Sequence, residues 1–185
     1  MFRKMIRLFN SLIINNIKFL LIKLFHFKKF SFKFLNIISP LNSFDIQDEG
    51  KIILHDKLNI PSKSIFGVRE KGILEINDGS FINNNCQIIS HKKIAIGKNV
   101  CIGPNTIIMD HDHVFGKNGV EKKIFKSKEI IIEDNAWIGA NCVILKGARI
   151  GKNSVVAAGS IVNCDVPENS ILIQKKENEF KKINI

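Results

Sequence analysis

The chain has few acidic residues at its N-terminal end, where positive charge accumulates. No Asp or Glu occurs before Asp45, yet eight of the 28 Lys and Arg residues precede it. The formal net charge of +11 is therefore mainly that of an N-terminal arm. No helix-turn-helix signature, zinc-finger spacing or aromatic-basic platform accompanies this charge. The composition thus argues against nucleic acid as the partner.

Cysteine is also sparse, and its spacing is uninformative for metal or disulfide chemistry. The four cysteines, Cys86, Cys101, Cys142 and Cys164, form no CxxC pair. Without a secretory signal we expect neither a disulfide framework nor a zinc cluster, and no metal ligands are predicted. Cys86 and Cys142 occupy a small-residue position of the repeat described below, so we interpret them as small apolar fillers.

The arm lacks a long apolar run. Its longest uninterrupted run covers residues 19–22, far below the roughly 20 residues needed to cross a bilayer. No cleavage site follows an apolar stretch, which argues against a signal peptide. Apolar residues nevertheless recur at helical spacing from Phe2 to Leu24, with Arg and Lys between them. Two interpretations remain open: residues 1–36 lie on an anionic membrane surface, or the arm caps the end of the core.

A six-residue repeat dominates the second half of the chain. An aliphatic residue returns at every sixth position: Ile132, Ile138, Ile144, Ile150, Val156 and Val162. This period fits neither an α-helix nor a simple strand, and it predicts a β-helix built from six-residue sides. Each coil exposes an apolar face until the next coil stacks on it, so several coils are needed for stability.

Upstream, the same phase is less regular. It is poor from residue 40 to 72 and becomes clear at Ile76, Ile82 and Ile88. It then slips by two residues near His91 and resumes at Ile96, Ile102 and Ile108. Counting through this slip places His91 one coil away from His111 at the same point of the hexad. We therefore expect these two histidines to stack.

The repeat breaks at Asp110-His111-Asp112-His113, where residues 110–129 become polar and basic. A long loop inside a compact repeat is usually functional. Imidazole is the natural general base near neutral pH. This break is therefore the strongest local sign of chemistry.

The hexads, together with Trp137-Ile138-Gly139-Ala140, resemble the hexapeptide-repeat acyltransferases, in particular sugar and capsule O-acetyltransferases. The resemblance implies an all-β fold, a left-handed parallel β-helix with three hexads per coil. We expect a basic amphipathic arm over residues 1–44, the β-helix with its long protruding loop over 45–170, and a charged tail over 171–185. The resemblance also implies a homotrimer with active sites between chains, and acetyl-CoA as co-substrate.

The resemblance assigns roles to particular residues. Counting without gaps from Ile108 places the family's catalytic histidine at His113, with His111 as the second choice. Ala140 is expected to offer its N–H to the oxyanion. The coenzyme groove is expected to include Trp137, Gly139, Ala140, Ala158, Lys175 and Lys176. The acceptor side is expected to include Asn83, Asn85 and Asp110, although asparagine is also common in turns because it tolerates left-handed backbone conformations.

The expected function is acetyl-CoA-dependent O-acetylation of a sugar hydroxyl in surface-polysaccharide or lipid-linked glycan biosynthesis. We expect a cytoplasmic protein, with peripheral contact at the inner face of the membrane if the arm binds lipid. A small soluble acceptor such as a free sugar, serine or an antibiotic is the alternative within this class. Two alternatives outside the acetyltransferases are a zinc enzyme like the gamma-type carbonic anhydrases and a non-catalytic scaffold. Both stay open because a fold alone does not determine function.

Overall fold

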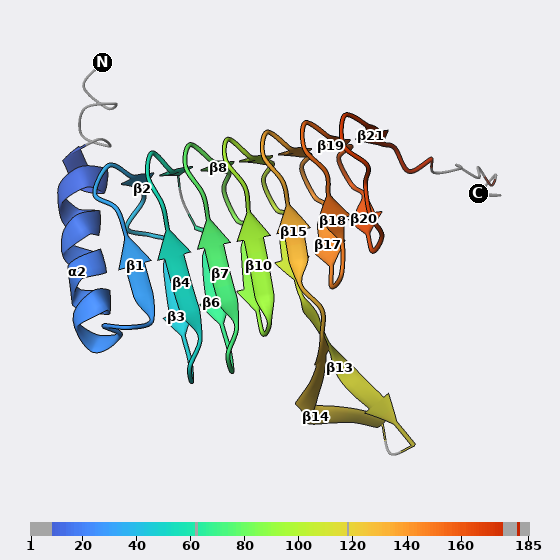
Figure 1. Cartoon of the computed structure of the whole chain (residues 1–185), viewed down its shortest axis with the longest axis horizontal. Coiled ribbons are helices and arrows are strands. Elements are labelled where there is room, and N and C mark those ends of the chain that lie inside the picture. The colour runs from blue at the N-terminus through green and yellow to red at the C-terminus, as the bar shows by residue number, and fades with distance from the viewer. Residues whose placement is uncertain (1–8, 62, 118, 176–180, 182–185) are drawn as a thin grey trace, which may run out of the picture.

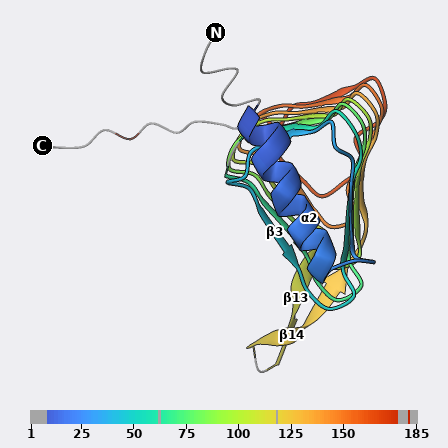
Figure 2. The ribbon, with the colours of Figure 1, turned by 90° about the vertical axis from the view of Figure 1, so that its left-hand side faces the viewer.

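The computed structural model describes residues 9–61, 63–117, 119–175 and 181. Its body is a parallel β-helix in which successive coils contribute strands to three sheets (Figure 1). The chain rises along the first sheet, crosses the second and descends along the third while advancing away from the N-terminal end, so the coils are left-handed (Figures 1 and 2). The predicted fold class is confirmed.

Each of the three sheets contains only parallel neighbours. Sheet A holds, in spatial order, β1 (Phe30–Phe32), β4 (Lys51–Leu54), β7 (Ile73–Ile76), β10 (Lys93–Ile96), β15 (Ile130–Ile132) and β18 (Arg149–Ile150). Sheet B holds β2 (Ile37–Ile38), β5 (Asn59–Ile60), β8 (Phe81–Ile82), β11 (Cys101–Ile102), β16 (Trp137–Ile138), β19 (Val155–Val156) and β21 (Ile171–Leu172). Sheet C holds β3 (Ser43–Ile46), β6 (Ile65–Val68), β9 (Gln87–Ser90), β12 (Ile107–Met109), β17 (Val143–Leu145) and β20 (Ile161–Val162).

The coils differ in length, which explains why the hexad phase is poor upstream. Phe30 pairs with Ile52, 22 positions later, whereas Leu74 pairs with Ile94, 20 positions later. Only the late coils have the 18-residue length of three hexads, as in the pairing of Ile132 with Ile150. The early coils are thus regular in space and are not a separate irregular region.

The β-helix also begins earlier than predicted. β1 and β2 pair with β4 and β5, so residues 30–44, which we expected in the arm, form the first coil. The boundary at residue 45 is corrected to about Phe30. The sequence hid this coil because its Phe-rich strand does not follow the aliphatic hexad.

Aliphatic residues fill the interior, as the repeat predicts. Ile132, Ile138, Ile144, Ile150, Val156 and Val162 are all buried. Cys86 and Cys142 are buried as free thiols, as expected of small fillers. The interior is mainly apolar, and buried polar side chains such as Ser80, Thr106 and Asp110 lie beside the ends of strands.

Two helical segments lie across the N-terminal end of the solenoid, η1 (Asn10–Ile14) and α2 (Asn15–Phe25) (Figure 2). Phe19 is fully buried, and its ring contacts those of Phe30, Phe32 and Phe44 at centroid distances of 5.2 Å. The described part of the arm therefore caps the first coil. Residues 1–8 of the predicted helix lie outside the described residues. Among those described, no helix combines the length and apolarity needed to span a bilayer.

The expected long loop is a β-hairpin. β13 (His111–Gly116) and β14 (Gly119–Ser127) pair antiparallel and project from the corner between β12 and β15 (Figure 1). The register shifts between His113 and Val114. The segment thus has secondary structure of its own, and its base places β14 beside the histidines.

Candidate active site

Asp110 is the buried anchor of the corner where the hairpin begins. Its carboxylate accepts hydrogen bonds from the Ser90 hydroxyl at 2.8 Å and from three consecutive backbone N–H groups, those of His91, Lys92 and Lys93, at 2.8–2.9 Å. Burial raises the pKa of Asp110, but hydrogen bonds from His111, His91, Lys92 and Ser90 outweigh it, and the net pKa is lowered. Asp110 therefore remains a carboxylate at neutral pH. Because its side chain is fully buried, it cannot contact an acceptor, which corrects its expected role.

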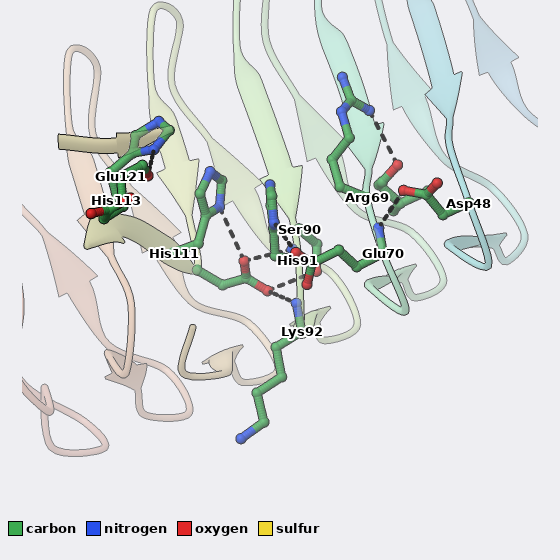
Figure 3. Close-up of polar contacts among 11 residues, drawn as sticks. Asp48, Arg69, Glu70, Ser90, His91, Lys92, His111, His113 and Glu121 are labelled. Carbon is green, nitrogen blue, oxygen red and sulfur yellow. Dashed lines mark hydrogen bonds and ion pairs between the residues drawn. The ribbon is translucent and has the colours of Figure 1, made fainter. Parts of the chain in front are cut away.

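His111 contacts this carboxylate, and its side chain lies next to that of His91 (Figure 3). Its Nδ1 is 3.3 Å from Asp110 Oδ1, and its side chain is 13% exposed. A carboxylate at Nδ1 favours the tautomer in which Nδ1 carries the proton and Nε2 presents a lone pair. Within the described part of the chain no group hydrogen-bonds to Nε2. The pair is therefore arranged so that Nε2 can act as a base.

His91 stacks on His111, as the phase of the repeat predicts. The ring centroids are 3.8 Å apart with a tilt of 34°. Burial lowers the pKa of His91, and His111 lowers it further, while Glu70 and Asp110 oppose these effects. His91 Nδ1 has no hydrogen-bond partner among the described residues, and Glu70 Oε1 is 3.8 Å away. His91 is thus a neutral ring at neutral pH that packs against His111.

His113, the first choice from counting, has a different environment. It lies on β13, exposed, with Nδ1 3.3 Å from the carbonyl oxygen of Glu121. Among the described residues, no buried carboxylate contacts His113. The geometry therefore favours His111 over His113 as a base.

Phe125 on β14 links the three histidines, a role that the sequence did not reveal. Its ring centroid is 4.3 Å from that of His91, 5.5 Å from His111 and 4.6 Å from His113. The only signal was an aromatic residue within a basic segment, and the hairpin pairing that brings it back to His113 could not be read from the repeat. Phe125 thus forms an apolar wall over the histidine cluster.

A second feature is a groove of about 450 Å³ on sheet B. Five residues predicted for the coenzyme or acceptor line it: Asn83, Trp137, Gly139, Ala140 and Ala158. Ala140 and Ala158 occupy equivalent places in adjacent coils, since Gly139 N–H donates to Val156 O and Gly159 N–H donates to Ala140 O. The sequence thus correctly predicted that these residues lie together.

Close packing between neighbouring coils also explains the small residues of this groove. A Cβ on Gly139 would lie 2.5 Å from the Ala158 nitrogen, and one on Gly103 would lie 2.5 Å from the Ala140 nitrogen. Glycine is therefore required by the approach of neighbouring coils. The backbone N–H groups of Ala140 and Ala158 donate to no acceptor in the described part of the chain. Both are unused donors in the lining of the groove.

The histidine cluster and the groove do not meet within one chain. Gly103 and Pro104 of the groove precede β12, whereas Asp110 and His111 follow it. The length of a sheet C strand therefore separates the two features. The two features are therefore separate sites on one chain.

The remaining predicted residues are less informative. Asn85 adopts φ = 59°, and its Nδ2 donates to Asn105 Oδ1 in a ladder of stacked turns, so its structural role accounts for it. Lys175 is exposed, and Lys176 lies outside the described residues. Within residues 9–61, 63–117, 119–175 and 181 no three His, Cys, Asp or Glu side chains form a metal-binding group.

Residues 129–164 match the family model described as the hexapeptide repeat of succinyl-transferase. This stretch of the chain thus carries the hexapeptide repeat, in agreement with its parallel coils. It is 35% identical over 106 residues to a galactoside O-acetyltransferase of Lactococcus lactis, an alignment covering 57% of this chain and 51% of that protein. The chain thus spans about half the length of this relative.

Two other relatives extend the comparison. A putative lipopolysaccharide biosynthesis O-acetyl transferase of Escherichia coli is 27% identical, with 62% of this chain and 63% of that protein aligned. A hexapeptide-repeat acetyltransferase of Vibrio cholerae, solved with acetyl coenzyme A, is 31% identical with a TM-score of 0.54, covering 70% of this chain and 64% of that one. The resemblance predicted from the hexads is confirmed.

Proposed function

We propose that this hexapeptide-repeat protein transfers an acetyl group from acetyl-CoA to a sugar hydroxyl, with His111 as the general base. The observation that carries the proposal is the Asp110–His111 pair, in which a buried carboxylate orients an imidazole at the break of the repeat. The relatives support this reaction class, since they are named O-acetyltransferases and the Vibrio cholerae protein was solved with acetyl coenzyme A.

In the proposed reaction, His111 Nε2 removes the proton of the acceptor hydroxyl as its oxygen attacks the thioester carbonyl. The carbonyl oxygen becomes an oxyanion, which the N–H of Ala140 stabilises. Collapse of this intermediate breaks the carbon–sulfur bond, and the coenzyme thiolate takes the proton from the His111 imidazolium. Asp110 stabilises the imidazolium while it exists, and the products are the acetyl ester and free coenzyme A.

The proposed site is shared between chains of a homotrimer. Trp137 and the small residues around Ala140 and Ala158 line a groove that would hold the pantetheine arm, while His111 lies beyond the far end of β12. A neighbouring chain that places its His111 beside this groove completes the site. Lys175 and Lys176 remain candidates for the coenzyme phosphates.

The proposed acceptor is a sugar of a surface polysaccharide or lipid-linked glycan. Asn83 is the remaining candidate for an acceptor contact, because it lines the groove, although its side chain also accepts a hydrogen bond from Asn84 N–H. The printed name of the Escherichia coli relative supports a glycan, and that of the Lactococcus lactis relative supports a galactoside.

The test is thiol release from acetyl-CoA across a panel of glycans and small hydroxyl compounds. We expect His111→Asn to lower the rate by roughly 10²–10⁴, the usual effect of removing a general base. His113→Asn is the matched control, since it changes an exposed histidine two positions away, and we expect near-normal activity. Loss of activity in His113→Asn with retention in His111→Asn would show that the geometry has assigned the base incorrectly.

A further inference from the structure

Among the described residues, the outer face of the N-terminal helical cap is apolar and exposed. Phe19 points into the first coil, and the Lys18 ammonium donates to the carbonyls of Pro40 and Asn42 instead of pointing outward. The opposite face carries seven large apolar side chains that are 45–81% exposed: Ile13, Ile14, Ile17, Leu20, Leu21, Leu24 and Phe25. An exposed apolar patch of this kind marks an interaction surface.

A cluster of lysines lies beside the C-terminal end of α2. Lys28, Lys29, Lys51 and Lys71 line a cavity of about 450 Å³ with Glu49 and Ile73. In the described part of the chain, Lys28, Lys51 and Lys71 are exposed and form no ion pair. Lys28 follows α2 directly, while Lys51 at β4 and Lys71 before β7 lie about one and two strand spacings of about 4.8 Å from the first coil.

We infer that this end of the solenoid docks on an anionic lipid bilayer. The apolar residues of α2 enter the boundary between headgroups and acyl chains, while the lysine cluster faces lipid phosphates. A second copy of the chain is a poorer partner, because face-to-face contact of two such ends would bring like-charged lysines together. The docking does not depend on the proposed acetyl transfer.

Vesicle flotation of the full-length protein tests the docking. The protein should float with vesicles of phosphatidylcholine and phosphatidylglycerol in equal parts, and much less with phosphatidylcholine alone. Raising the salt should weaken the binding, because the Debye length falls from about 10 Å at 0.1 M to about 3 Å at 1 M. Failure of the wild-type protein to float with the anionic vesicles at low salt would overturn the inference.

Two pairs of matched variants locate the contact. Leu21→Gln with Leu24→Gln should lower the partition coefficient by about tenfold or more for each buried leucine. The control, Ile171→Gln with Ile173→Gln, changes two similarly exposed aliphatic residues at the opposite end of the solenoid from the helical cap. Lys28→Gln with Lys71→Gln should lower it by about 30-fold, since each lysine near the surface contributes about fivefold. Lys122→Gln with Lys123→Gln on the hairpin is the control.

Equal effects of test and control pairs would contradict the inference. Light scattering of the soluble protein gives a second outcome. If the leucine variant reduces the mass of a soluble assembly, the outer face of α2 is an interface between copies, and the lipid assignment is wrong. An unchanged mass, with circular dichroism like that of the wild type, supports the bilayer as the partner.

Discussion

Asp110 and His111 show that neighbouring residues in a break of the repeat have separate tasks. The Asp110 carboxylate holds the turn that carries His91, because its oxygens accept hydrogen bonds from three backbone N–H groups and from the Ser90 hydroxyl. The same carboxylate contacts His111 Nδ1. A single buried charge therefore fixes the shape of one coil and orients a side chain on the next.

Asp110→Asn should destabilise the protein at neutral pH by roughly 1.5–3 kcal/mol, the usual value of hydrogen bonds to a charged group. The folded-state pKa of Asp110 is lowered, so its stabilisation is present above the unfolded value of about 3.9 and is lost as pH falls through the folded value. The difference between variant and wild type should therefore shrink below about pH 4. Urea midpoints measured across pH test this, and a difference that is constant with pH would contradict it.

The hairpin is the element that distinguishes this corner from the others. It leaves the stack between β12 and β15. The coils before and after it still pair in register, since Ile94 of β10 pairs with Ile130 of β15. β14 returns Phe125 over His91, His111 and His113. The hairpin thus adds an aromatic wall without disturbing the aliphatic interior.

Phe125→Ala should expose His91 to water. Because burial is the main cause that lowers the pKa of His91, its pKa should rise toward the ordinary value of about 6.5. Global stability should change little, because Phe125 is outside the buried core. Histidine ring titration by NMR measures the shift, and Phe115→Ala on the same hairpin, where the side chain is 78% exposed, is the control. An unchanged His91 pKa would show that Phe125 does not shield it.

At the scale of elements, the sequence predicted the late coils well and the early ones poorly. The hexads ending at Val162 mark buried residues in 18-residue coils, but a six-residue count cannot follow coils of 22 and 20 residues such as those joining Ile52, Leu74 and Ile94. The stacking of His91 and His111 was predictable because both follow a regular aliphatic residue. The Asp110 network and Phe125 were not, because turn hydrogen bonds and hairpin register depend on atomic positions.

At the scale of the whole molecule, the separation of His111 from the groove makes the oligomer part of the proposed mechanism. A mixture of His111→Asn chains with Ala158→Phe chains should regain partial activity, since an interface can pair an intact histidine with an intact groove. Ala158 is exposed, so the larger ring should fill the groove without entering the core. Thiol release by verified mixed trimers is the measurement, with each variant alone as the control. No recovery would place both halves of the site in one chain.

The order of sheet C also sets the distance along the axis between His111 and the helix-capped end. β12 is the fourth strand from the helix-capped end, after β3, β6 and β9, and parallel strands repeat at about 4.8 Å. His111 therefore stands about 15 Å along the axis from the first coil. If the capped end rests on a bilayer, the number of coils sets the height at which a tethered acceptor meets the imidazole. Adding or removing one early coil would change that height by about 4.8 Å while leaving the chemistry of the corner unaltered.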